Sequence, residues 1–233
     1  MANPFCVIVL GGWSPGPLTV VKQSLSSRNC VAVMEPDIPM PPMKCSWLLD
    51  PCVAAFFAVL GCTSWAYHAI ERQGLLLIPL TIIALGALRL CVAGIVRGSL
   101  QRGVRKTMAI MKTSKTELIV GFSWGGSVVA EMLQRGLVGC GPNQPKVLLI
   151  APVTAVVGAI CMQNDAALQV QVDESSRVHV FHASDDAFFC PHPERWANSG
   201  VTYHMCHDTH AFMRRQSQHQ IVQAMNHMLQ LHD

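Results

Sequence analysis

The apolar positions of the chain fall into short continuous runs, most of which end at a turn signal. Six runs of five or six residues are rich in β-branched and aliphatic side chains, as is typical of strands buried on both faces. Helix-compatible stretches follow, including residues 127–135 and residues 211–231, where apolar side chains recur at helical spacing. This alternation predicts an α/β fold with a mostly parallel sheet of about six strands. The six runs lie at residues 5–10, 30–34, 117–122, 146–150, 177–181 and 201–205.

A segment between the second and third runs differs from the rest of the chain. Residues 51–70 contain no Asp, Glu, Lys or Arg, and the only charged side chain in residues 74–96 is Arg89. Each stretch is about 20 residues long, enough for a helix to cross the hydrocarbon core of a bilayer. We therefore predict a tight hydrophobic helical hairpin that is inserted into the α/β domain. The domain is assigned to residues 1–45 and 97–233, and the insert to residues 46–96.

Charge on either side of the insert predicts its orientation. Lys44 precedes it, and Arg97, Arg102, Arg105 and Lys106 follow it. Because positive charge favours the cytosolic side of a membrane, we expect a membrane protein whose α/β domain faces the cytosol. His68 and Arg89 interrupt the apolar spans, so two other arrangements remain open, namely a lid over the active site and a helix pair in the membrane interface.

Composition narrows the class of partner. Charged residues make up only 13% of the chain, the mean hydropathy is +0.33 and the net charge is +3. Basic runs interleaved with aromatic residues are missing, so we expect no nucleic acid partner. The ten cysteines form no Cys-x-x-Cys pair and the first residues lack the basic region of a signal peptide, which favours reduced thiols in a cytosol-facing protein.

A serine stands at the junction of the third apolar run and the helix-compatible stretch after it. Gly121-Phe122-Ser123-Trp124-Gly125 has small residues two positions before and two positions after the serine. Such a pattern permits a sharp strand-to-helix turn that exposes the hydroxyl, and a glycine-rich turn without chemistry is the alternative. We therefore expect Ser123 to be a nucleophile.

The order of the polar residues that follow resembles that of the α/β-hydrolase superfamily, in which the serine precedes an acid and then a histidine. After the run at 177–181, the segment His182-Ala183-Ser184-Asp185-Asp186 is similar to the one that supplies the acid in that superfamily. The resemblance implies Asp186 as the acid, with Asp185 as the second candidate. It also implies His210 as the base, ahead of His207, because His210 directly precedes the last helix and is followed by a small and an aromatic residue.

A glycine pair after the first run resembles the oxyanion loop of the same superfamily. Gly11-Gly12-Trp13 has Leu10 in front of it, where the superfamily often has a histidine. The resemblance implies backbone N–H donors from Gly12 or Trp13 and from Trp124, although the glycine pair could also form an ordinary turn. It covers residues 4–41 and 100–231 and implies a minimal three-layer sandwich with the insert after the second strand.

Other chemistry has little support in the sequence. No phosphate-binding Gly-x-x-x-x-Gly-Lys-Ser/Thr motif is present. His204, His207 and His210 recur every three residues, but no second cluster completes a zinc site. We therefore expect no metal and no cofactor.

These features predict a serine hydrolase at a membrane surface. Ser123 would attack a carboxylic ester or thioester, His210 would move the proton, and Asp186 would orient the imidazole. The apolar insert favours a lipidic acyl substrate. The alternative is a catalytically silent subunit that the hairpin anchors in a membrane protein complex.

Overall fold

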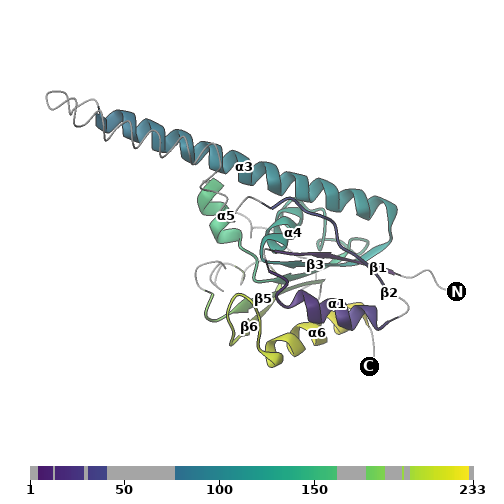
Figure 1. Cartoon of the computed structure of the whole chain (residues 1–233). Coiled ribbons are helices and arrows are strands. Elements are labelled where there is room, and N and C mark those ends of the chain that lie inside the picture. The colour runs from purple at the N-terminus through teal and green to yellow at the C-terminus, as the bar shows by residue number, and fades with distance from the viewer. Residues whose placement is uncertain are drawn as a thin grey trace.

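A six-stranded sheet forms the centre of the computed structural model (Figure 1), which describes residues 5–12, 14–28, 31–40, 77–161, 177–186, 196 and 200–230. The strand order is β2-β1-β3-β4-β5-β6, and every pairing is parallel. The expected α/β class and the mostly parallel sheet are therefore confirmed. The strands are β1 (Phe5–Leu10), β2 (Val31–Met34), β3 (Thr116–Phe122), β4 (Lys146–Ile150), β5 (Val178–Ala183) and β6 (Thr202–Cys206).

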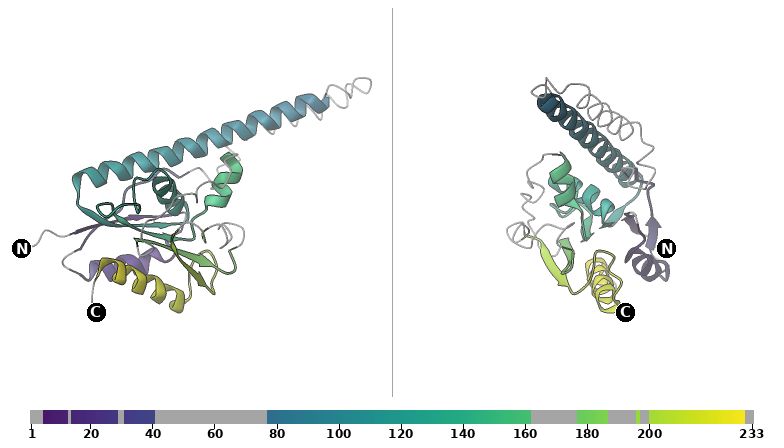
Figure 2. Two further views of the ribbon diagram at one scale, coloured as in Figure 1. Left: turned by 180° about the vertical axis from the view of Figure 1, so that it is seen from behind. Right: turned by 60° about the vertical axis from the view of Figure 1, so that its left-hand side comes forward.

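Helices cover both faces of the sheet, which explains why the strand segments are apolar without alternation. On one face lie α1 (Leu18–Ser26) and α6 (Arg215–Leu229), and on the other lie α3 (Leu77–Thr113), α4 (Trp124–Gln134) and α5 (Thr154–Cys161) (Figures 1 and 2). Alternate residues of β1 enter different cores. Val7 and Val9 join the core under α1 and α6, whereas Ile8 joins the core under α3 and α4. The result is a three-layer sandwich.

The order of the strands reverses between β1 and β3. From β1 the chain continues to β2 on one side, and from β3 it continues through β4 to β6 on the other. The carboxyl ends of two neighbouring strands therefore lead their chains away in opposite directions. Such a switch point leaves a crevice, and it is where open α/β sheets bind ligands.

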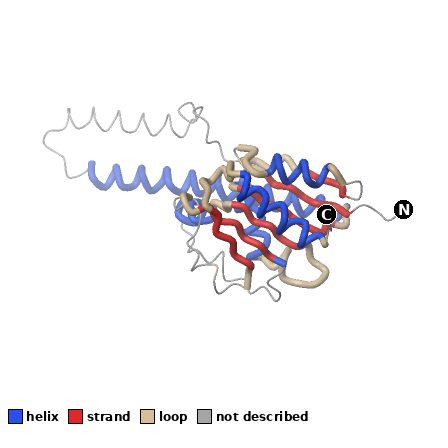
Figure 3. Tube along the Cα trace, turned by 90° about the horizontal axis from the view of Figure 1, so that it is seen from below, coloured by secondary structure: helices blue, strands red, loops and turns tan. Residues whose placement is uncertain are grey.

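The long helix α3 contains most of the second predicted apolar run. The first run, residues 51–70, lies outside the described residues, and the predicted domain boundary at residues 96 and 97 falls inside α3. The part of α3 from Ala93 onward buries Val96, Leu100 and Val104 against the sheet layer. The other end projects past the sheet (Figures 1 to 3) and exposes Ile83 and Leu90.

The expected membrane-spanning helix finds no support in the described part of the chain. Among the residues placed there, no helix combines the length and the apolar character needed to cross a membrane. In α3 the apolar run continues directly into a half that carries Arg97, Arg102 and Arg105. The hairpin as a whole stays a prediction, because one of its two arms is not among the described residues.

Candidate active site

Ser123 occupies a strained turn at the carboxyl end of β3. Its φ of 54° and ψ of −115° lie in a region that side chains rarely adopt, and it directly precedes the first turn of α4. A Cβ on Gly125 would lie 2.2 Å from the Leu10 carbonyl oxygen, and one on Gly121 would lie 2.8 Å from the Gly125 carbonyl oxygen. Both positions of the motif therefore require glycine, because the turn brings three backbone segments into contact.

Backbone hydrogen bonds hold the turn from two neighbouring strands. The Ser123 amide donates to the Ile150 carbonyl at 3.0 Å, and the Gly125 amide donates to the Gly11 carbonyl at 3.0 Å. The turn is thereby bonded both to the end of β4 and to the segment after β1. These bonds and the surrounding core supply the support that a strained conformation needs to persist.

Three predicted residues come together at this end of the sheet. His210 Nε2 lies 2.9 Å from Ser123 Oγ, and His210 Nδ1 contacts Asp186 Oδ2 in a hydrogen bond. The Asp186 side chain is 1% exposed and that of His210 is 27% exposed. With the proton on Nδ1 facing the carboxylate, Nε2 is free to accept the serine proton, which is the arrangement that nucleophilic acyl transfer requires.

The parallel pairing of β5 and β6 explains why residues far apart in sequence meet. Asp186 follows β5 and His210 follows β6, and the carboxyl ends of parallel strands lie at one edge of the sheet. The Ser184 amide donates to the Cys206 carbonyl at 2.8 Å, so the two segments stay bonded past the ends of the strands. The rings of Phe122 and His210 lie 5.6 Å apart, which places the imidazole beside the end of β3.

Asp185 and His207, the second candidates for the acid and the base, lie outside this line of hydrogen bonds. The exposed Asp185 side chain accepts a hydrogen bond from the Ser184 hydroxyl at 3.1 Å, not from His210. His207 is also exposed, and its Nδ1 lies 3.4 Å from the same hydroxyl. The hydrogen bonds that join Ser123, His210 and Asp186 include neither of these side chains, so the geometry favours the pair Asp186 and His210.

The segment after β1 lies against the serine. A Cβ on Gly12 would be 2.6 Å from the Ser123 Cβ and 2.9 Å from its Oγ. Trp124 begins α4, where the helix dipole favours negative charge, and its indole donates to the Pro39 carbonyl at 3.2 Å. Trp13 lies outside the described residues. The oxyanion roles of Gly12, Trp13 and Trp124 stay predictions, and the backbones of Gly12 and Trp124 are adjacent to the nucleophile.

The remaining titratable groups near this edge do not form a second reactive centre. Burial, and to a smaller extent the charge of Asp208, raise the pKa of the Cys206 thiol to about 11, so this cysteine stays protonated. His204 packs against Phe181, and its Nε2 lies 3.0 Å from His179 Nδ1. It takes no part in the hydrogen bonds that join His210 to Asp186 and Ser123. In the described ranges no three His, Cys, Asp or Glu side chains are grouped closely enough to hold a metal ion.

One buried polar residue of this region was not singled out in the sequence. Asp208 is 2% exposed and lies two residues before His210. An aspartate shortly before a helix is a common capping signal, and that signal could have identified it.

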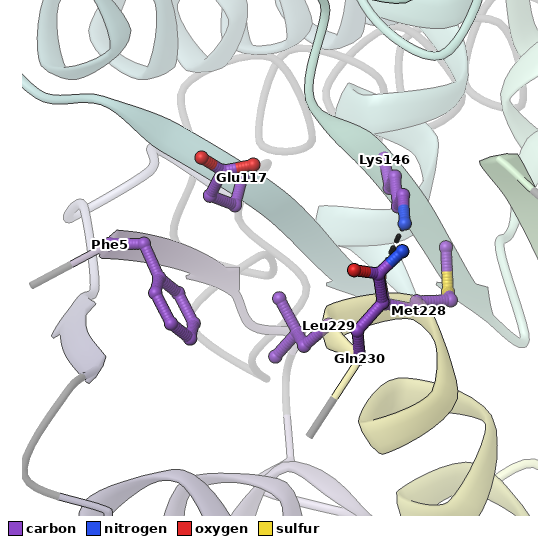
Figure 4. A pocket seen from close by; sticks show the side chains of 6 residues that line it. All are labelled: Phe5, Glu117, Lys146, Met228, Leu229 and Gln230. Atoms are coloured by element: carbon purple, nitrogen blue, oxygen red, sulfur yellow. Dashed lines mark hydrogen bonds between the residues drawn. The ribbon is translucent and has the colours of Figure 1, made fainter. Parts of the chain in front are cut away.

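A cavity of about 240 Å³ lies at the opposite edge of the sheet. It is lined by residues at the starts of β1, β3 and β4 and at the end of α6 (Figure 4). Lys146 closes the last turn of α6 by donating to the Met228 carbonyl at 2.5 Å. The lining contains no serine, cysteine or histidine, so this cavity adds no nucleophile or base. The lining residues are Phe5, Glu117, Lys146, Met228, Leu229 and Gln230.

Comparisons with solved structures identify the fold. No protein-family model and no curated protein matches the sequence. A protein from Xanthomonas campestris pv. campestris that is classed as a hydrolase of the alpha/beta superfamily aligns over 98% of this chain and 99% of its own, with a TM-score of 0.50 and 17% identity. A protein from Agrobacterium vitis S4 that is classed as a hydrolase aligns over 97% of this chain and 88% of its own, with a TM-score of 0.55 and 15% identity. Together with the parallel sheet and the serine turn, these likenesses show that the chain has the α/β-hydrolase fold.

Proposed function

We propose that this chain is a serine hydrolase that cleaves a carboxylic ester or thioester through an acyl-enzyme intermediate. The observation that carries the proposal is the continuous line of hydrogen bonds from Asp186 through His210 to Ser123 Oγ. A line of this kind, with an ionisable acid at one end and a strained serine at the other, has no evident structural purpose. The two structural neighbours are both classed as hydrolases, which agrees with the proposal.

In this mechanism His210 Nε2 takes the hydroxyl proton as Ser123 Oγ attacks the carbonyl carbon of the substrate. The carbonyl oxygen becomes negatively charged, and the expected donors to it are the amides of Gly12 and Trp124, two residues that adjoin the nucleophile. The imidazolium then gives its proton to the departing alkoxide or thiolate. Water, activated by the same histidine, hydrolyses the acyl-enzyme and restores Ser123.

Asp186 acts throughout as a fixed negative charge. Its buried carboxylate accepts from His210 Nδ1, which selects the tautomer with a free Nε2 and offsets the charge of the imidazolium. Because the side chain is almost completely buried, water does not compete for this hydrogen bond.

We further propose that the acyl substrate is lipidic and that the enzyme works at the cytosolic surface of a membrane. The support is the surface of α3, which exposes 67% of Ile83 and 65% of Leu90. The same helix carries six Lys and Arg residues and no Asp or Glu. An apolar end joined to a basic stretch is the pattern of a helix that binds the interface of an anionic bilayer.

Labelling with a fluorophosphonate probe tests the catalytic proposal, because the probe reacts only with an activated serine. We expect the wild-type chain to be labelled and Ser123→Ala and His210→Ala to be unlabelled. Ser127→Ala is a matched control, since Ser127 is also buried in α4 and its hydroxyl has no hydrogen-bond partner within the described part of the chain. We expect this variant to be labelled like the wild type.

Absence of labelling in correctly folded wild-type protein would overturn the proposal. It would instead favour the silent subunit, most clearly if the chain co-purified with a stoichiometric partner. Labelling that persisted in Ser123→Ala would place the nucleophile at another residue.

A further inference from the structure

Asp208 is a buried carboxylate whose hydrogen bonds all come from its own loop and the helix after it. The Thr209 amide donates to Oδ1 at 2.8 Å, and the Arg214 amide donates to Oδ2 at 2.9 Å. Burial alone would raise the pKa of Asp208, but the amides of Arg214 and Thr209, the Ser217 hydroxyl and the Met213 amide together lower it. The group is therefore an ionised carboxylate that neutral donors satisfy.

The two oxygens of this carboxylate bond opposite ends of the segment that carries His210. Thr209 directly precedes the histidine, and Arg214 is the residue from which α6 starts. Inside the segment, Phe212 adopts a positive φ of 49° and is completely buried, so neither strand nor helix hydrogen bonding continues through it. The carboxylate supplies the hydrogen bonds that regular structure would otherwise provide.

The same residue is bonded to the segment that carries the acid. The Asp208 carbonyl accepts from the Asp185 amide at 3.1 Å, one residue before Asp186. Through its side chain Asp208 thus holds the loop of the base, and through its backbone it holds the loop of the acid. The side-chain bonds can be removed by substitution, whereas the backbone bond cannot.

We propose that Asp208 is a positioning residue, whose carboxylate fixes the loop that keeps His210 Nε2 at 2.9 Å from Ser123 Oγ. This inference rests on the proposed hydrolase function. Proton transfer to the histidine depends steeply on that separation, and a displacement of about 1 Å can cost about 100-fold in rate. The Asp208 carboxylate accepts from the Thr209 and Arg214 amides and not from the serine or the imidazole, so its effect on the reaction is carried by the loop.

The variant Asp208→Asn tests the inference with the smallest change of shape. The asparagine keeps one acceptor oxygen, but its NH₂ group replaces the other. One of the two backbone amides then faces a second donor in place of an acceptor, so one hydrogen bond is lost and the two N–H groups repel each other. We expect the turnover number per active site to fall about 10- to 100-fold while KM for a p-nitrophenyl ester changes by less than about threefold. Active sites are counted by stoichiometric labelling with the fluorophosphonate probe.

Asp185→Asn is the matched control. Asp185 is a neighbouring acid whose exposed carboxylate accepts from the Ser184 hydroxyl. Its contact with Asp208 uses the backbone amide, which the substitution leaves in place. We expect its turnover number to equal that of the wild type within about twofold. If Asp208→Asn does not fold, Ser217→Ala removes one donor to the carboxylate and leaves the acid in place. For that variant we expect a smaller fall in turnover number, with KM unchanged.

The outcomes separate this inference from the function on which it rests. A wild type that is not labelled rejects both. A labelled wild type with an Asp208→Asn variant that keeps the full turnover number per active site, even at a reduced melting temperature, rejects the positioning role alone. In that case Asp208 serves stability only.

Discussion

Gly12 and Ser123 approach each other so closely that no side chain fits between them. A Cβ at residue 12 would meet the serine Cβ at 2.6 Å and Oγ at 2.9 Å, distances that real Cβ atoms do not show. In Gly12→Ala, either the loop after β1 or the serine must therefore move. We expect probe labelling and esterase turnover to fall about 100-fold, because the displacement acts on the nucleophile itself.

Gly98→Ala is a suitable control for this prediction. Gly98 lies in α3, and a Cβ added there would meet no atom within 4 Å. Alanine favours a helix over glycine by about 1 kcal/mol, so we expect unchanged turnover and a slightly higher melting temperature. Equal activity of the two variants would mean that the Gly12 segment does not constrain the serine.

Ser123 was expected from a local pattern, whereas Asp186 and His210 were implied by the resemblance to the α/β-hydrolase superfamily. Ser123 is bracketed by glycines, and His210 directly precedes a helical pattern. Asp208 leaves a weaker signal, because a buried carboxylate that binds backbone amides differs from an exposed aspartate only in its three-dimensional surroundings. That information lies in the packing and not in the local sequence.

Strand β5 and the edge strand β6 contain a pair of neighbouring histidines, and we expect this pair to make folding sensitive to pH. His204 stacks on Phe181 with ring centroids 4.3 Å apart, and its Nε2 lies 3.0 Å from His179 Nδ1. Burial lowers the pKa of His204 in the folded state below the ordinary histidine value of 6.5. As the pH falls below about 6.5, the unfolded chain therefore binds more protons than the folded chain, and stability is lost.

We expect the free energy of unfolding of the wild type to decrease between about pH 7 and about pH 5.5. His204→Phe removes the titrating group and keeps a ring against Phe181, so its free energy of unfolding should decrease less over the same interval. Urea unfolding at the two pH values measures the difference. The expectation fails if both proteins lose the same free energy, since other histidines would then account for the whole slope.

The strands were predicted closely, whereas the helices differed at their ends. The predicted helix at 127–135 begins at Trp124, because the strained turn at Ser123 leads directly into it. The predicted helix at 211–231 begins only at Arg215, because Phe212 takes a positive φ and Asp208 holds the loop in front of the helix. In both places the backbone conformation of a segment of the candidate site determines where the helix begins. The spacing of apolar residues, on which the prediction depended, does not contain that information.

At the scale of the whole molecule, the candidate site and the projecting helix α3 are connected through the layer of helices on one face of the sheet. The serine lies at the switch point of the sheet, and α3 packs its inner half on the same layer as α4, the helix that begins beside the serine (Figure 2). A surface that binds α3 would therefore hold the catalytic domain in a defined orientation. The sequence predicted the apolar character of this segment, but the continuous helix from Leu77 to Thr113 was not expected, because the basic residues after Val96 resembled a boundary.

Binding of α3 to an anionic bilayer is the prediction that belongs to this scale. We expect the full chain to co-sediment with phosphatidylcholine vesicles that contain phosphatidylserine and to bind less to phosphatidylcholine alone, because each basic residue near such a surface contributes about 1 kcal/mol. Arg102→Glu combined with Arg105→Glu should remove the dependence on phosphatidylserine. Both side chains are exposed, and they donate hydrogen bonds to groups of their own helix.

The apolar end of α3 can be tested separately from its charge. Leu90→Glu places a carboxylate at a side chain that is 65% exposed, so it should leave the fold intact while it opposes insertion into the interface. We expect it to weaken binding to both kinds of vesicle, because the loss concerns apolar area and not only attraction to headgroups. Gln223→Glu adds the same charge on α6, which covers the opposite face of the sheet, and should bind like the wild type. If Gln223→Glu weakened binding as much as Leu90→Glu, net charge and not the surface of α3 would determine attachment.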